Sequence, residues 1–318
     1  MTARRRARAD APILGEVTRP PAAEVIRSPP PDAREQRRPS ARRRVGALAG
    51  ALVHACHPEP TAAVTALGTA LAVSAGRPAG GVLGVALAVL TGQLSVGWSN
   101  DYLDRERDRL ANRADKPVAG GVPPPRVVAV AALVALAACV PLSFASGWRA
   151  GCAHLAAVAL AWSYNLGLKA TALSVVPYLL AFALLPAFVV LGLPGHPAPP
   201  WWALAGGALL GAGAHFANVL PDLTDDLRTG VHGLPHRLGQ RRSRGAAAVL
   251  VLAASAVVAL GPGRPGPLPV AGLALATVLV VAGIAADRGG KGVGAFRVTI
   301  AVALIDVALF VAAGRSLA

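Results

Sequence analysis

Apolar runs separated by short polar or basic stretches follow one another from residue 45 to the end of the chain. Each run suits a helix of about 20 residues that crosses a bilayer. The expected spans are 47–74, 80–100, 126–146, 150–166, 172–193, 201–221, 245–261, 267–286 and 294–314. Pro58 and Pro60 should kink the first span or delay its regular part until Thr61. The pattern predicts an all-α integral membrane protein with about nine transmembrane helices in residues 45–318.

The composition supports a membrane protein. Of the 318 residues, 54% are hydrophobic and 15% are charged, and the mean hydropathy is +0.53, which is too apolar for an ordinary soluble domain of this size. A net charge of +15 could indicate nucleic-acid binding. The Arg and Lys residues lie instead in a tail and in loops between apolar runs, where they act as orientation signals, so we expect no nucleic acid. Cys56, Cys139 and Cys152 lack metal-ligand spacing, which favours core packing.

Residues 1–44 are rich in Arg, Pro and Ala, and they lack the apolar core and cleavage site of a secretory signal. We predict a disordered, basic cytoplasmic tail that lies along anionic lipid. With this tail inside, the inner loops are 101–125, 167–171, 222–244 and 287–293, and they hold most of the remaining Arg and Lys. The distribution obeys the positive-inside rule, so the second and sixth spans should end at the cytoplasmic face of the cell membrane.

Two rows of oxygen-bearing side chains mark the ends of these two spans. The first row is Asn100, Asp104 and Asp108, the second is Asn218, Asp222 and Asp226, and Asp101 and Asp225 lie beside them. A spacing of four residues turns only about 40° per step on a helix, so each row should lie on one face. Crowded carboxylates repel one another and resist desolvation, which indicates sites for hard cations such as magnesium.

Basic side chains follow both rows. They are Arg105, Arg107, Arg109, Arg113 and Lys116 after the first row, and Arg228, His232, His236, Arg237, Arg241, Arg242 and Arg244 after the second. Carboxylates for magnesium beside Arg and Lys for phosphate oxygens indicate a diphosphate site. Pro221 should bend the sixth helix just before Asp222, as happens where a helix lines a cavity. The sequence therefore predicts two similar halves, each with an Asp-rich motif, around a central cavity.

The motifs resemble those of the UbiA superfamily of intramembrane prenyltransferases. NDYLDRERD at 100–108 matches that family's NDxxDxxxD, and DLTDDLRTG at 222–230 matches its DxxxDxxxG. The resemblance extends over nearly all of residues 45–318. It implies magnesium bound by both motifs, an isoprenoid diphosphate as donor, and a lipid-facing cavity that holds the isoprenoid tail.

Further side chains are expected to contact the substrates. The expected diphosphate contacts are Arg113, Lys116, Lys169 and Arg237. Two features depart from the family pattern: Tyr164 and Lys169 are five residues apart where four is usual, and Lys116 offers a point charge where the family usually has a bidentate Arg. The role of Tyr164 stays open. His215 could orient an acceptor or remove a proton, and a hydrogen-bonded cavity histidine explains it equally well.

Other polar side chains have simpler interpretations. His54, His57 and Glu59 are possible substrate contacts, but a helix-entry turn at the lipid interface is the preferred interpretation. Asp306 lies within the ninth span, where an ionised carboxylate must face protein, and pairing with a neighbouring helix is preferred to a role in the pocket.

Three functions are compatible with these features. The favoured one is magnesium-dependent transfer of an isoprenoid group within the bilayer to a small lipophilic, aromatic or quinone-like acceptor, with catalysis depending on Asp104, Asp222, Lys169 and His215. Cyclisation of the isoprenoid diphosphate without an acceptor is the alternative, because it would use the same magnesium site. A cation-coupled transporter is disfavoured, since its acidic residues should lie near the membrane midplane rather than at one face.

Overall fold

The computed structural model describes residues 41–111, 113, 116–263, 266–286, 293–313 and 317. The chain divides into two compact units, Met1–Arg44 and Val45–Ala318. Apart from residues 41–44, the described residues belong to the second unit. Of the expected basic tail, residues 1–40 lie outside the described part of the chain.

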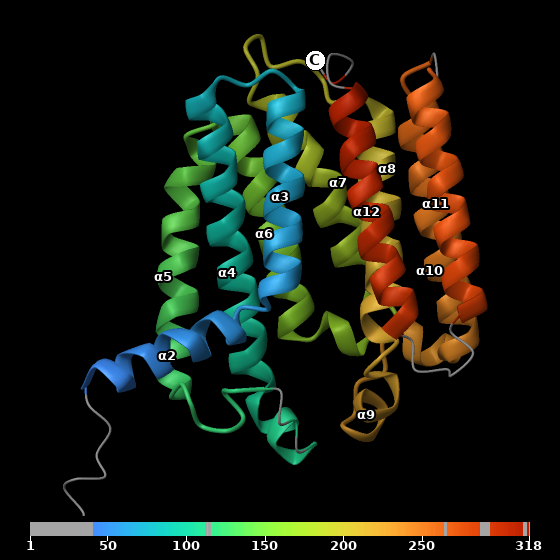
Figure 1. The fold of residues 1–318 in the computed structure, drawn as a ribbon. Helices are drawn as coiled ribbons and strands as arrows, with labels where there is room; N and C mark the ends of the chain where they lie inside the picture. The colour runs from blue at the N-terminus through green and yellow to red at the C-terminus, as the bar shows by residue number, and fades with distance from the viewer. Residues whose placement is uncertain are drawn as a thin grey trace, which may run out of the picture. The chain divides into compact units, whose positions relative to one another are not determined.

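Regular structure in the described residues is helical throughout, which confirms the all-α fold class. The longer helices are α3 (Pro58–Ser74), α4 (Ala79–Leu110), α5 (Pro125–Phe144), α6 (Trp148–Leu166), α7 (Val175–Leu191), α8 (Trp201–Val219), α10 (Leu234–Leu260), α11 (Pro267–Ala286) and α12 (Val293–Ala313). Shorter pieces are α2 (Ala41–Ala55), η1 (Leu168–Ala170) and α9 (Leu223–Arg228). Within residues 45–318 the longer helices run side by side as a bundle (Figure 1). Among the described residues, α4, α5 and α10 are long and apolar enough to cross a membrane.

The first predicted span, 47–74, is not a single helix, because its residues belong to two helices, α2 and α3. His57 adopts φ 55° and ψ 71°, a left-handed conformation that ends the first helix. Pro58 then begins α3, since proline has no N–H to lose in the first turn of a helix and its fixed φ already suits one. The regular part therefore starts three residues before Thr61.

The second and sixth predicted spans differ from the structure at the ends that carry the Asp rows. Helix α4 continues for ten residues beyond the predicted end at 100 and stops at Leu110. Helix α8 stops at Val219, and α9 begins separately at Leu223. Pro221 lies in this break, because it cannot donate the hydrogen bond that a continuous helix needs. The expectation that Asn218, Asp222 and Asp226 share one helix is therefore wrong.

Close helix contacts hold the second half of the bundle together. A Cβ on Gly207 would lie 2.4 Å from the Phe182 carbonyl oxygen, and a Cβ on Gly211 would lie 2.4 Å from the Tyr178 carbonyl oxygen. Only glycine lets α8 approach the backbone of α7 this closely. This contact keeps α8 in a fixed position relative to α7.

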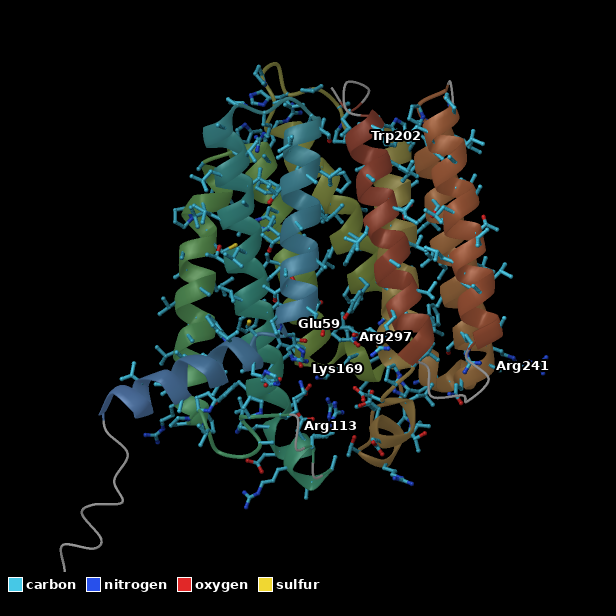
Figure 2. All side chains as sticks on the ribbon, in the orientation of Figure 1. Glu59, Arg113, Lys169, Trp202, Arg241 and Arg297 are labelled. Carbon is cyan, nitrogen blue, oxygen red and sulfur yellow. The ribbon has the colours of Figure 1, made fainter. Side chains whose placement is uncertain are left out.

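The two ends of the bundle carry different polar groups. The ends of α4 and α6 and the short helix α9 lie at one end, called the site end below (Figure 1). At the opposite end, the buried Arg77 donates to the Gly192 carbonyl at 2.6 Å and to the Ser146 hydroxyl at 3.1 Å. Figure 2 shows Arg113 and Lys169 at the site end and Trp202 at the other.

Asp306 is fully buried in α12. Neither of its carboxylate oxygens has a well-formed hydrogen bond within the described part of the chain, but the Ser255 side chain of the neighbouring helix α10 lies close enough to interact with the carboxylate, in line with the expected pairing.

Candidate active site

The first Asp row lies on α4 as its spacing predicts. Asp104 is the centre of a charged cluster: its carboxylate accepts from Lys169 Nζ, with 2.6 Å to Oδ2, and from Arg107 Nη2 at 2.8 Å. The Asn100 amide donates to Asp104 Oδ2 at 3.1 Å. Asp108, one turn further along, is also buried. Two cations from different parts of the chain therefore converge on one buried carboxylate.

Helix α6 holds the start of this row from the side. Asn165 is buried, and its amide donates to the Val96 carbonyl and to the Ser99 hydroxyl, both at 2.9 Å. Its carbonyl oxygen accepts from Asn100 Nδ2 at 3.2 Å. Because Asn100 uses its N–H groups on Asp104 and Asn165, its own carbonyl oxygen is left out of these bonds.

Asp101 turns to a different set of partners. It is 2% exposed, and its Oδ1 lies 2.7 Å from Lys116 Nζ and 3.0 Å from His57 Nε2. Its other oxygen, Oδ2, is buried without a hydrogen-bond partner among the described residues. Asp101 therefore links the first row to the loop after α4 and to the turn before α3.

The second Asp motif is more exposed than the first. Asp222 has 43% of its side chain exposed and pairs with Arg113 at 3.3 Å. Asp225 is 53% exposed and pairs with Arg228 on the same short helix, while Asp226 lies 3.2 Å from His236 Nε2. Asn218 is exposed on α8, before the break at Pro221.

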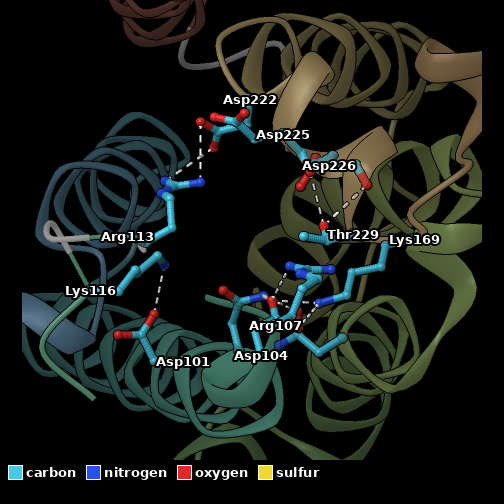
Figure 3. Close-up of polar contacts among 12 residues, drawn as sticks. Asp101, Asp104, Arg107, Arg113, Lys116, Lys169, Asp222, Asp225, Asp226 and Thr229 are labelled. Carbon is cyan, nitrogen blue, oxygen red and sulfur yellow. Dashed lines mark hydrogen bonds and ion pairs between the residues drawn. The ribbon is translucent and has the colours of Figure 1, made fainter. Parts of the chain in front are cut away.

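These groups surround one opening at the site end of the bundle. In Figure 3, Asp222 and Asp226 lie across from Asp104, with Arg113 and Lys116 on one side and Lys169 on the other. A cavity of about 630 Å³ lies at this end, lined by Arg107, Leu110, Ala111, Asp225, Arg228 and Thr229. Burial lowers the pKa of the Lys169 ammonium, and the neighbouring Asp104 opposes this shift. The arrangement combines acidic and basic groups from both halves of the bundle, as a diphosphate site requires.

Comparison with protein families gives this geometry a context. The model of the UbiA prenyltransferase family matches residues 61–310. The chain belongs to the UbiA prenyltransferase family. Membership makes it a prenyltransferase of a membrane-embedded family, as the apolar helices and the two motifs indicate.

Solved structures share the fold of this UbiA family member. An apo UbiA homologue from Aeropyrum pernix K1 is 21% identical with a TM-score of 0.64, over 79% of this chain and 97% of that one. A UbiA homologue from Archaeoglobus fulgidus bound to GPP and Mg²⁺ is 20% identical with a TM-score of 0.64, over 84% and 99%. A structure described as digeranylgeranylglyceryl phosphate synthase is 17% identical with a TM-score of 0.62, over 85% and 99%. A comparison with curated proteins found no match.

The donor set of this UbiA chain fits magnesium. Among the described residues, no three His, Cys, Asp or Glu side chains lie close enough to hold a metal ion by themselves. Magnesium is usually bound by one or two carboxylates together with substrate phosphates and water, so a complete protein cage is not required. Carboxylates on opposite sides of the opening, such as Asp104 and Asp222, can each supply part of such a coordination sphere.

Two further predicted site residues, His215 and Arg237, differ in burial. His215 is fully buried, with Nε2 3.0 Å from the Ser174 hydroxyl and its ring 5.7 Å from Tyr164 and 5.0 Å from Tyr178. This resembles the hydrogen-bonded cavity histidine more than a group in direct contact with an acceptor. Arg237 is exposed, and its Nε donates to the His232 carbonyl at 2.9 Å.

Three residues of the site received no specific role from the sequence. Arg107 was noted only as one of several basic residues, although its position three residues after Asp104 places both on one helix face. The prolines around His57 indicated a turn before a helix, but nothing in the sequence indicated its contact with Asp101. Nothing indicated the contact of Asn165 with α4 either, because it depends on how two helices pack.

Proposed function

We propose that this protein transfers an isoprenoid group from an allylic diphosphate to a small aromatic or quinone-like acceptor within the membrane, with magnesium as cofactor. The observation that carries the proposal is the convergence of Lys169 and Arg107 on the buried Asp104, opposite the second motif. Structural support comes from the Archaeoglobus fulgidus homologue, which binds GPP and Mg²⁺.

The two Asp motifs would hold the metal. The proposed ligands are Asn100, Asp101, Asp104 and Asp108 from the first motif and Asn218, Asp222, Asp225 and Asp226 from the second. Among them, Asp225 has the weakest support, because it is exposed and paired with Arg228 on its own helix, and Asp101 is turned toward Lys116. When bound, magnesium neutralises the charge of the diphosphate and makes it a better leaving group.

Basic side chains of the chain hold the diphosphate in place. Lys169 and Arg107 both pair with Asp104. Lys116 pairs with Asp101, and Arg113 pairs with Asp222. Lys169, Arg107 and Lys116 have N–H groups beyond those used in these pairs, and charge-assisted hydrogen bonds to phosphate oxygens can use them. The allylic carbon–oxygen bond then breaks, with its electron pair leaving on the diphosphate.

The apolar helices complete the reaction by excluding water. The carbocation that remains is spread over the allyl group and would be hydrolysed in an aqueous site. In a water-poor cavity, an electron-rich acceptor attacks the allylic carbon and then loses a proton. Tyr164 and Tyr178, whose rings lie 5.2 Å apart beyond Lys169, place aromatic surface deeper in the bundle than the charged cluster.

The orientation in the membrane follows from the charges. We propose that the N-terminus and both Asp motifs are cytoplasmic, because the inner loops hold most of the basic residues that follow the tail. Residues 1–44 would then form a basic tail whose charges are attracted to anionic lipid.

Product analysis tests the proposal. The purified protein is incubated with geranylgeranyl diphosphate and magnesium, with and without candidate aromatic acids, and the products are identified by mass. We expect a product with the combined mass of acceptor and isoprenoid group, formed only when an acceptor is present. A cyclised hydrocarbon formed without acceptor would mean that the protein is a cyclase and not a transferase. If the diphosphate is not consumed under any condition, both the transferase and the cyclase assignments are wrong.

A further inference from the structure

The turn between α2 and α3 is held in an unusual conformation beside the site. His57 has φ 55°, which residues with a side chain rarely adopt. Such conformations persist where the surroundings determine them, and they are frequent at functional sites. The contacts of this turn therefore bear on what His57 does.

Two contacts fix the turn on α4, and a third joins it to the first turn of α3. The Trp98 indole N–H donates to the Leu52 carbonyl at 2.9 Å, and a Cβ on Gly97 would lie 2.3 Å from the Cys56 carbonyl oxygen. The Thr61 hydroxyl donates to the same Cys56 carbonyl at 2.8 Å. The backbone of residues 52–57 is thus held against the helix that carries the first Asp row.

The His57 side chain points from this turn to a charged pair of the site. Its Nε2 lies 3.0 Å from Lys116 Nζ and 3.0 Å from Asp101 Oδ1, while Lys116 Nζ lies 2.7 Å from that same oxygen. Nε2 cannot serve both neighbours as hydrogen-bond partner at once: with the His57 proton on Nδ1 it accepts from the Lys116 ammonium, and with the proton on Nε2 it donates to Asp101 Oδ1. In either tautomer His57 contacts the Lys116–Asp101 pair, and the ammonium has N–H groups beyond these contacts for a ligand.

Two fixed neighbours restrict where the Lys116 ammonium can lie. A lysine side chain is flexible and offers a point charge, so it contributes to recognition only when neighbours limit its conformations. Asp101 is 2% exposed and Lys116 13% exposed, so both groups are largely withdrawn from water. His57 is the second neighbour, in contact with both Lys116 and Asp101, and comes from outside α4 and its following loop.

We propose that His57 is a positioning residue that holds the Lys116 ammonium in place to bind the diphosphate. The inference rests on the proposed function, because it takes the diphosphate as the ligand of Lys116. A helix-entry turn alone does not require these contacts, since any residue that tolerates the left-handed conformation could occupy position 57.

Binding of inorganic pyrophosphate in the presence of magnesium, measured by calorimetry on the purified full chain, tests the assignment. His57→Asn is the informative variant, because Asn tolerates the left-handed conformation while its shorter side chain loses the contact with Lys116. We expect its affinity to fall about tenfold, the size of one charge-assisted hydrogen bond. His54→Asn, an exposed histidine three residues earlier, is the matched control and should stay within about twofold.

A double substitution separates positioning from a structural role. If His57 acts through Lys116, His57→Asn should have no further effect on the affinity of a Lys116→Gln variant. Additive losses, or an unchanged affinity of His57→Asn in the wild-type background, would overturn the inference and leave the proposed function intact. If the wild-type chain binds neither magnesium pyrophosphate nor magnesium geranyl diphosphate, the proposed function fails, and this inference fails with it.

Discussion

The two Asp motifs have the same spacing in the sequence and different structures. In the first, Asp104 is 9% exposed on a continuous helix, and Lys169 from another part of the chain holds it. In the second, Asp222 precedes a short separate helix and is 43% exposed. The equal spacing therefore supplies the same kinds of oxygen ligand in both motifs. The carboxylates of the first motif are held more rigidly, because burial depends on what packs against each motif.

A single residue accounts for much of this difference. Pro221 separates α8 from α9, whereas α4 runs through its motif without interruption to Leu110. The first motif is thus supported by a rigid helix and by Asn165 of α6. We infer that the first motif is a fixed half of the site and that the second can adjust to a bound metal diphosphate.

Removal of the metal should have the largest effect, because it affects both motifs at once. Carboxylates can hold a diphosphate only through cations, so EDTA should abolish product formation. Magnesium or manganese in excess should restore it. Product formation from geranylgeranyl diphosphate is the measurement, and full turnover in the chelator would contradict a metal site at either motif.

Substitution of one carboxylate in each motif should separate stability from catalysis. Asp104→Asn and Asp222→Asn should each lower turnover by at least about a hundredfold, because neither motif can replace the ligands of the other. Asp104→Asn should in addition destabilise the fold, on the order of 3 kcal/mol, since it leaves Lys169 and Arg107 without their buried partner. Asp222→Asn should leave the melting temperature nearly unchanged.

Turnover and thermal unfolding, measured on the same preparations, check this pair. The comparison between a fixed and an adjustable motif fails if both variants unfold at the same lowered temperature. A residual turnover above about a tenth in either variant would show that the motif concerned is not a catalytic metal site.

Basic residues beside the first motif should matter more for turnover than basic residues beside the second. Lys169→Gln should lower turnover about ten- to a hundredfold, because the ammonium is 10% exposed and held where it can reach a phosphate oxygen. Arg237→Gln, on the side of the second motif, should change turnover less than about threefold, since its guanidinium is exposed. The reverse order of effects would place the diphosphate beside Arg237.

Local signals in the sequence predicted most of the helices. Helix α11 begins at Pro267 and ends at Ala286 as expected, whereas α6 begins at Trp148, two residues before the expected start at 150. Both helices begin at a proline or directly after a glycine, and the backbone preferences of these residues act over a short distance. The apolar pattern ended the second span at residue 100, and only the spacing of the Asp row indicated that the helix continues to Asp108.

The partners of the site residues were harder to predict. The spacing of Asn100, Asp104 and Asp108 was sufficient to place them on one face of α4. The contact between Asp104 and Lys169 depends on how α4 packs near η1, and the contact between Asp101 and His57 depends on a left-handed turn. A single sequence carries no record of such packing between helices.

The smallest effect should come from Asp225, which like Asp101 is a carboxylate beside one of the two rows. Asp225→Asn removes a carboxylate that is 53% exposed and paired only with Arg228 on its own helix, among the contacts described. Such exposed pairs contribute little, so the affinity for magnesium pyrophosphate should stay within about threefold of the wild type. Asp101→Asn provides the contrast: it removes the anion that Lys116 and His57 share, and it should weaken pyrophosphate binding about tenfold. Calorimetry with magnesium pyrophosphate measures both variants, and equal losses would mean that Asp225 binds metal directly and that the second motif is as organised as the first.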